Sequence, residues 1–168
     1  MQKLRMEHIY KSYGQAVVLQ DFSYAFTPGG ITCIMGESGA GKTTLLYFMA
    51  GLLNPQHGSI RLCGSDLRKM GAREIAKTVG YVPQIHTPAF DYRVLDFVMM
   101  GCAPKIGIFS KPTEEDERRC IEVLESMGLM HLAFKSYRNI SGGERQQVMI
   151  ARTMVQKPKV VLFDEPTA

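Results

Sequence analysis

The alternation of apolar and polar residues near the start of the chain predicts two neighbouring β-strands. Apolar residues alternate with polar ones over Leu4–Ile9 and again over Val17–Phe26, as in strands with one buried face. Tyr13-Gly14-Gln15 lies between the two runs and is typical of a turn. Ile31–Met35 is short, apolar and rich in branched residues, which predicts a strand buried on both faces, as in a parallel sheet.

The next part of the chain alternates between helical and strand patterns. Thr44–Leu53 contains no proline and predicts a helix, with Gly51 near its end and Pro55 just beyond. The later predicted elements are, in order, a strand at 58–62, a short helix at 73–77, a strand at 78–82, a helix at 113–127, a helix at 141–155 and a strand at 159–165. Strands that alternate with helices predict an α/β fold with a mostly parallel sheet, to which the first two strands add an antiparallel portion.

Residues 85 to about 139 have a different character, because strand-like runs disappear and helical spacing takes over. Thr113 follows Pro112 and precedes acidic residues, which is typical of a capped helix start. We interpret this region as a helical subdomain inserted into the α/β core. The expected division is an N-terminal part of the core at 1–84, the helical subdomain at 85–140, and the last helix and strand at 141–168, where the core is incomplete.

Composition restricts the classes of protein only mildly. The 168 residues are 45% apolar and 21% charged, and a net charge of +4 suits an anionic ligand or a membrane-proximal location without indicating nucleic acid. We see no signal peptide and no run long enough to span a bilayer, so the cytosol is the expected compartment. The four cysteines are too scattered for a disulfide or a zinc site, and we expect buried, reduced thiols at Cys33, Cys63, Cys102 and Cys120. The histidines are equally dispersed, and we assign no metal to His8, His57, His86 and His131.

The segment Gly36–Thr44 has the spacing G-x-x-x-x-G-K-[ST] between a predicted strand and a predicted helix. Its glycines allow positive φ and a close approach of backbone N–H groups to a phosphate. Lys42 supplies a charge for the outer phosphates, and the Thr43 hydroxyl suits a Mg²⁺ ligand. The plainer alternative is a glycine-rich turn before a lysine. The candidate phosphate-binding residues are Gly36, Glu37, Ser38, Gly39, Ala40, Gly41, Lys42, Thr43 and Thr44.

Ser141, Gly142, Gly143 and Glu144 open the helix predicted at 141–155. Ser141 and Glu144 have the spacing of a capping box, so a plain helix cap is one interpretation. The two glycines are unfavourable in a first turn but leave bare N–H groups at a positive helix end, which indicates a second anion site. Two such helix ends in one chain suggest that they face each other across a dimer.

Two carboxylates, Asp164 and Glu165, follow the apolar run that begins at Lys159. Ligands of α/β sheets bind beyond the carboxyl ends of the strands. We therefore expect Asp164 to hold Mg²⁺ through water and Glu165 to act as the general base for an attacking water, whereas an acidic turn after a strand is the plainer alternative.

Taken together, these motifs resemble the nucleotide-binding subunit of an ATP-binding cassette (ABC) transporter over the whole chain and in the family's order. Gly36–Thr44 is similar to the Walker A motif, Ser141–Gln147 to the family signature and Val160–Glu165 to the Walker B motif. The signature disfavours other phosphate-loop kinases and GTPases. The resemblance implies a P-loop NTPase core that uses ATP and Mg²⁺ and hydrolyses ATP.

The resemblance assigns roles to two further residues. Tyr13 lies where the family has an aromatic residue that stacks on adenine, although a strand-end tyrosine is the plainer reading. Gln84 lies at the family's glutamine loop, which implies a catalytic and metal-site role and coupling to the membrane subunits; by itself it would be an ordinary loop glutamine. Pro166-Thr167-Ala168 begins the loop that contacts the opposite subunit in the family.

Within the family, Val94–Ser110 is similar to subunits that energise import of iron-siderophore complexes, haem or cobalamin, although Gly101-Cys102 replaces their usual Gly-Arg pair. The implied partners are a second ATP-binding subunit in a homodimer, a polytopic permease and, indirectly, a substrate-binding protein, at the cytoplasmic face of the membrane and without nucleic acid.

The family continues beyond position 168, so we expect this chain alone to hydrolyse ATP poorly or not at all. A soluble ABC ATPase of DNA repair, chromosome maintenance or translation is the alternative, disfavoured by the compact helical insert.

Overall fold

The computed structural model describes residues 4–84, 90–107 and 110–165, and the chain divides into two compact units, Met1–Val79 and Gly80–Ala168. The first unit contains β1 (Leu4–Tyr13), β2 (Ala16–Phe26), α1 (Lys42–Met49), β3 (His57–Leu62), β4 (Ser65–Asp66), the 3-10 turn η1 (Leu67–Lys69) and α2 (Ala72–Thr78). After β5 (Val79–Val82), which begins at the division, come α3 (Val94–Met99), η2 (Met100–Cys102), α4 (Glu114–Ser126), η3 (Met130–Leu132), η4 (Tyr137–Asn139), α5 (Gly142–Gln156) and β6 (Val160–Phe163).

The sheet of the first unit is antiparallel, with the strand order β2-β1-β3-β4. Leu4 pairs with Phe26 on one side and with Leu62 on the other. Leu4 and Met6 are buried whereas Arg5 is exposed, which confirms the predicted alternation for β1, but β2 contains no buried residue. The predicted turn is also confirmed, although β1 continues four residues beyond the predicted end, to Tyr13.

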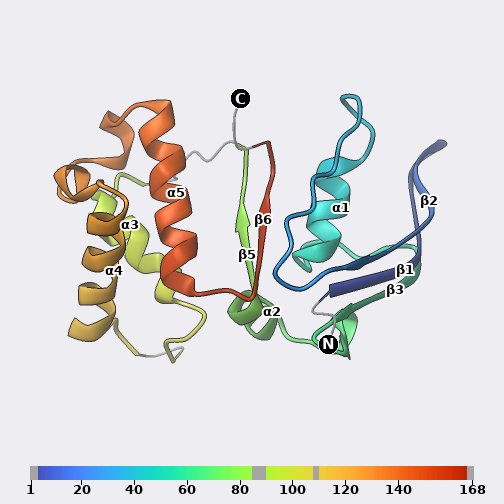
Figure 1. Cartoon of the computed structure of the whole chain (residues 1–168), viewed down its shortest axis with the longest axis horizontal. Coiled ribbons are helices and arrows are strands. Elements are labelled where there is room, and N and C mark those ends of the chain that lie inside the picture. The colour runs from blue at the N-terminus through green and yellow to red at the C-terminus, as the bar shows by residue number, and fades with distance from the viewer. Residues whose placement is uncertain (1–3, 85–89, 108–109, 166–168) are drawn as a thin grey trace. The chain divides into compact units, whose positions relative to one another are not determined.

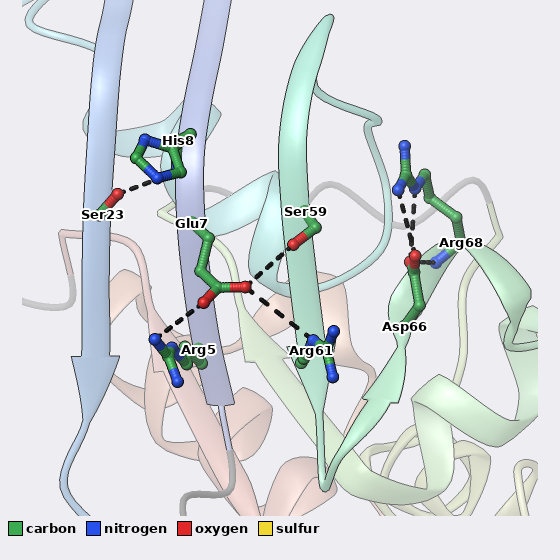
Figure 2. Close-up of polar contacts among 8 residues, drawn as sticks. All are labelled: Arg5, Glu7, His8, Ser23, Ser59, Arg61, Asp66 and Arg68. Atoms are coloured by element: carbon green, nitrogen blue, oxygen red, sulfur yellow. Dashed lines mark hydrogen bonds and ion pairs between the residues drawn. The ribbon is translucent and has the colours of Figure 1, made fainter.

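Polar side chains link β1 to β3 on the exposed face of this sheet (Figure 2). Glu7 pairs with Arg5 at 2.8 Å and lies 4.0 Å from Arg61, and the Ser59 hydroxyl donates a hydrogen bond to it at 3.3 Å. Exposed ion pairs of this kind contribute about 0–1 kcal/mol each. The buried face therefore holds the sheet together, and its larger members are Leu4, Met6, Ile9, Ile60 and Leu62.

The predicted buried strand at Ile31–Met35 is wrong. These residues form no strand, and Ile31 and Met35 are 101% and 87% exposed. A strand needs a neighbour that accepts and donates its ladder hydrogen bonds, and an apolar run by itself does not supply one. Within the described residues, the two sheets contain β2-β1-β3-β4 and β5-β6, and neither pairs with this segment.

Helix α1 confirms the helix predicted at Thr44–Leu53 but has different ends, Lys42 and Met49. Gly51 has a φ of +68°, its N–H donates to the Phe48 carbonyl at 3.1 Å, and the next residue, Leu52, donates to the Tyr47 carbonyl at 2.9 Å. This hydrogen-bond pair is the glycine-terminated helix end known as the Schellman motif. The chain therefore stops being helical before Gly51 rather than at Leu53.

The second unit contains three packed helices, α3, α4 and α5, which lie side by side in Figure 1. The rings of Phe97 and Tyr137 stack in their core with centroids 4.3 Å apart. A Cβ on Gly101 would collide with the main-chain oxygen of Arg152, so η2 approaches α5 too closely for any other residue. The helices predicted at 113–127 and 141–155 are confirmed as α4 and α5.

Strands β5 and β6 form a separate two-stranded sheet and run in the same direction (Figure 1). The Asp164 N–H donates to the Val82 carbonyl at 3.0 Å, which fixes the register at the carboxyl ends of the two strands. This confirms the parallel part of the predicted α/β fold. The residues that follow the two strands are consequently brought to one edge of this sheet.

All four cysteines are free, but the expectation that all are buried is wrong for two of them. Cys33 and Cys63 are exposed because they lie in the unpaired segment before α1 and in the turn between β3 and β4. Cys102 and Cys120 are buried in the core of the second unit. Burial and the neighbouring Cys102 raise the pKa of the Cys120 thiol to about 12.

Candidate functional site

The segment Gly36–Thr44, called the glycine loop below, has the backbone conformation that its glycines allow. Gly39 and Gly41 have φ values of +81° and +89°, and Gly41 is the residue that directly precedes α1. A Cβ on Gly41 would lie 2.5 Å from Cγ1 of Val18 on β2. Both the backbone conformation and this close approach therefore require glycine at position 41.

Lys42 is the first residue of α1, and its side chain folds back over the loop. Its ammonium group donates hydrogen bonds to the main-chain oxygens of Gly36 and Glu37, at 2.9 and 2.8 Å. These contacts hold a positive charge above the loop at a helix N-terminus, where the helix dipole adds about half a charge of the same sign. The loop and helix start together form a positively charged cradle that suits a polyphosphate.

The other residues of the predicted motif belong to the same loop and helix start. Glu37, Ser38 and Ala40 are exposed, and the Ala40 N–H donates to the Glu37 carbonyl at 3.2 Å. Thr43 is exposed and Thr44 half-buried in the first turn of α1. The structure thus brings Gly36–Thr44 together in one local unit, as a phosphate-binding loop requires.

The start of α5 forms the capping box that the Ser141 and Glu144 spacing predicts. The Glu144 N–H donates to the Ser141 hydroxyl at 3.2 Å, and the Ser141 N–H donates to the Glu144 carboxylate at 2.7 Å. This second hydrogen bond lowers the pKa of Glu144. The Ser141 hydroxyl accepts a hydrogen bond in the cap, and its own interaction with the Glu144 carboxylate lowers the pKa of Glu144 further.

Gly142 and Gly143 form the exposed first turn of α5. An added Cβ on either residue would meet no atom within 4 Å. No described residue accepts a hydrogen bond from either main-chain N–H, as is usual in a first helical turn. Neither packing nor capping within the described residues requires glycine here, and the plain-cap interpretation therefore explains Ser141 and Glu144 but not the glycine pair.

The carboxylates that follow β6 are hydrogen-bonded to side chains from β5 and from the loop after it. Asp164 is 6% exposed, and its Oδ2 accepts a hydrogen bond from the Tyr81 hydroxyl at 3.0 Å. The exposed Glu165, with a φ of +46°, accepts a hydrogen bond at 2.7 Å from Nε2 of Gln84. The structure therefore brings Gln84, Asp164 and Glu165 together at one edge of the β5-β6 sheet.

Tyr13 ends β1 and is 51% exposed, so its ring is accessible for stacking. The ammonium group of Lys11 lies 4.8 Å from the centre of this ring. An exposed contact of this kind is worth about 0.5–1 kcal/mol and does not fix the ring against displacement. The predicted site residues thus lie in both units: Tyr13 and Gly36–Thr44 in the first, and Gln84, Ser141–Glu144, Asp164 and Glu165 in the second.

The donor atoms of these residues suit Mg²⁺ and a nucleotide triphosphate. Each unit offers oxygen, the ligand that Mg²⁺ prefers: the first has the Thr43 hydroxyl, and the second has the Gln84 amide and the Asp164 carboxylate. The glycine cradle with its lysine offers the N–H groups and the charge that phosphates need. Sequence reasoning missed Tyr81, because its contact with Asp164 joins residues 83 positions apart and no local pattern signals such a pair.

Comparisons with known proteins agree on the fold. The chain matches a solved ATP-binding cassette from an ABC transporter, crystallised without nucleotide, with a TM-score of 0.85 and 26% identity over 100% of this chain and 70% of that one. The fold is therefore that of an ABC ATPase cassette. Residues 19–168 match the model of the family described as ABC transporter, and the chain belongs to this family.

Curated relatives have different cargoes. A probable iron chelatin transport ATP-binding protein of Helicobacter pylori is 36% identical over 166 residues, which cover 98% of this chain and 65% of the relative. A lipoprotein-releasing system ATP-binding protein, LolD, of Bacteroides fragilis is also 36% identical, over 98% of this chain and 76% of the relative. The chain thus spans about two thirds of the length of the first of these relatives.

Proposed function

We propose that the protein binds ATP with Mg²⁺ and hydrolyses it as the nucleotide-binding subunit of an ABC importer. The observation that carries the proposal is the glycine loop, whose positive-φ turn and folded-back lysine precede α1 in a chain of the ABC transporter family. In the proposed complex, the N–H groups of Gly36–Thr44 and the ammonium of Lys42 bind the phosphates. Tyr13 stacks on the adenine, and Thr43, Gln84 and Asp164 hold Mg²⁺, which neutralises phosphate charge.

Glu165 is the proposed general base. It accepts the proton of the attacking water, and a positioned base of this kind contributes typically about 10²–10⁴-fold to a rate. The hydrogen bond from Gln84 at 2.7 Å restricts the rotation of the Glu165 carboxylate. Gln84 therefore links the proposed base to the loop through which the family couples to its membrane subunits.

The proposed assembly is a homodimer in which Ser141, Gly142 and Gly143 of one copy contact the γ-phosphate bound by the other. The exposed glycine turn and the exposed Ser141 before it support this assignment. Hydrolysis removes the shared ligand and lets the copies separate, as in other switches held by a γ-phosphate. The further proposed partners are a polytopic permease and, indirectly, a substrate-binding protein, at the cytoplasmic face of the membrane. Within the described part of the chain, no helix has the length and apolar character needed to cross a membrane.

For the cargo we propose a metal chelate such as an iron-siderophore complex, haem or cobalamin. The resemblance of Val94–Ser110 to that group and the iron chelatin relative support this choice. Lipoprotein release is the second candidate, favoured by the equally identical relative from Bacteroides fragilis. Cys102 lies where the metal-chelate group has arginine, and its side chain is part of the core of the helical unit.

Reconstitution tests this proposal. The full-length protein should co-purify with a polytopic permease, and in vesicles the complex should accumulate a ferric chelate or cobalamin only with ATP and Mg²⁺. Extraction of a lipoprotein without chelate uptake would support the second candidate and refute the import proposal. Absence of ATP binding by the full-length protein, measured by equilibrium dialysis, would refute the function itself.

A further inference from the structure

Asp164 is an unusual residue of this fold because its carboxylate is buried. Asp164 is 6% exposed, and among the described residues it is the one acidic or basic residue that is buried. A buried carboxylate is strongly disfavoured unless hydrogen bonds or a cation compensate for its lost hydration. The groups around this carboxylate therefore determine its direction.

The Tyr81 side chain is hydrogen-bonded to Asp164 at 3.0 Å, and Tyr81 comes from the neighbouring strand. The phenol donates and the carboxylate oxygen Oδ2 accepts. The main chain fixes the same pair of strands at the same level, because the Asp164 N–H donates to the carbonyl of Val82, the residue after Tyr81. The Tyr81 ring is half-buried.

A hydrogen bond to one carboxylate oxygen restricts the rotation of the whole group. A carboxylate has about four lone-pair sites, so a bond from Tyr81 is compatible with a metal ion or a metal-bound water at another site. Partners of this kind orient metal-binding side chains, and their removal typically lowers metal affinity or activity by about 10–100-fold.

We propose that Tyr81 is a positioning residue that holds the Asp164 carboxylate in the direction needed for binding Mg²⁺ with ATP. The inference rests on the proposed function, because it assumes that Asp164 is the metal-binding carboxylate. It assigns to Tyr81 a role distinct from that of Gln84, whose hydrogen bond goes to Glu165.

The test measures metal binding rather than turnover. Mn²⁺ is titrated into the full-length protein with the non-hydrolysable analogue AMP-PNP, and free Mn²⁺ is followed by electron paramagnetic resonance. Tyr81→Phe removes only the hydroxyl, and Tyr92→Phe is the matched control, since Tyr92 is another half-buried tyrosine of the same unit, outside the site. AMP-PNP affinity without divalent metal and the melting temperature are measured for each variant.

We expect Tyr81→Phe to raise the apparent Kd for Mn²⁺ by about tenfold while the control keeps the wild-type value. Metal-free AMP-PNP affinity should be unchanged in both variants. A wild-type Kd for Mn²⁺ in Tyr81→Phe would overturn the inference and leave the proposed function intact. A parallel loss of metal-free nucleotide affinity would also overturn it, because the hydroxyl would then support the whole unit. Failure of the wild-type protein to bind Mn²⁺ with AMP-PNP would instead refute the proposed function.

Discussion

Replacing Gly41 with alanine tests whether packing against β2 determines the conformation of the glycine loop. The residue has a φ of +89°, and the new Cβ would lie 2.5 Å from Cγ1 of Val18. A left-handed conformation costs a non-glycine residue roughly 1–2 kcal/mol. The contact is more than about 1 Å shorter than an ordinary carbon–carbon contact of 3.5–4.0 Å, and overpacking of this kind costs about 1–3 kcal/mol more.

Gly14→Ala is the matched control because it shares the backbone strain but not the collision. Gly14 has a φ of +57°, and an added Cβ meets no atom within 4 Å. In urea unfolding of the full-length protein, we expect Gly14→Ala to lose roughly 1–2 kcal/mol and Gly41→Ala about 2–5 kcal/mol.

Truncating Val18 in the Gly41→Ala background should recover part of the difference. Combining Gly41→Ala with Val18→Ala should cost less than the sum of the two single changes, by about 1 kcal/mol or more. Equal losses for Gly41→Ala and Gly14→Ala, or strict additivity with Val18→Ala, would refute the argument that β2 shapes the loop.

The remaining predictions concern the thiols, the capping box and the chemistry. A maleimide should label Cys33 and Cys63 in the native protein but Cys102 and Cys120 only after unfolding, since burial excludes the reagent and raises the thiol pKa; mass spectrometry counts the adducts. Because the pKa of Glu144 is lowered in the folded state, the capping stabilisation should persist above the ordinary glutamate pKa and vanish as the pH falls through the lowered value. The protection of the Ser141 and Glu144 amides against hydrogen exchange should fall with this loss. In Glu144→Gln, this fall in protection with decreasing pH should disappear. Lys42→Ala should abolish ATP binding in equilibrium dialysis, and Glu165→Gln should accumulate an ATP-bound dimer in analytical ultracentrifugation. Normal turnover by Glu165→Gln would contradict the assignment of the base.

Local sequence signals predicted most of the fold correctly because they depend on neighbouring residues. Alternation predicted β1 and β2, Thr113 before acidic residues predicted the capped start of α4, and the spacing of Ser141 with Glu144 predicted the capping box of α5. Ile31–Met35 was wrong because its apolar run matches a buried strand, whereas strand formation depends on a partner elsewhere in the chain. A local pattern contains no information about that partner.

The candidate site shows the same limit. The motifs predicted which residues form the glycine loop and the start of α5, since each lies within a few positions of its partners. The hydrogen bonds from Tyr81 to Asp164 and from Gln84 to Glu165 join residues more than 80 positions apart. Only the pairing of β5 with β6 brings these residues together. The experiments described above test the roles that we propose for them.

The central claim is that ATP joins two copies of this protein between the glycine loop of one and the α5 start of the other. The most direct measurement is a crystal structure of the full-length Glu165→Gln protein with ATP and Mg²⁺. We predict that the phosphates contact Gly36–Thr44 of one copy and Ser141, Gly142 and Gly143 of the second. A paired assembly in which Ser141 is turned away from every phosphate would contradict the account.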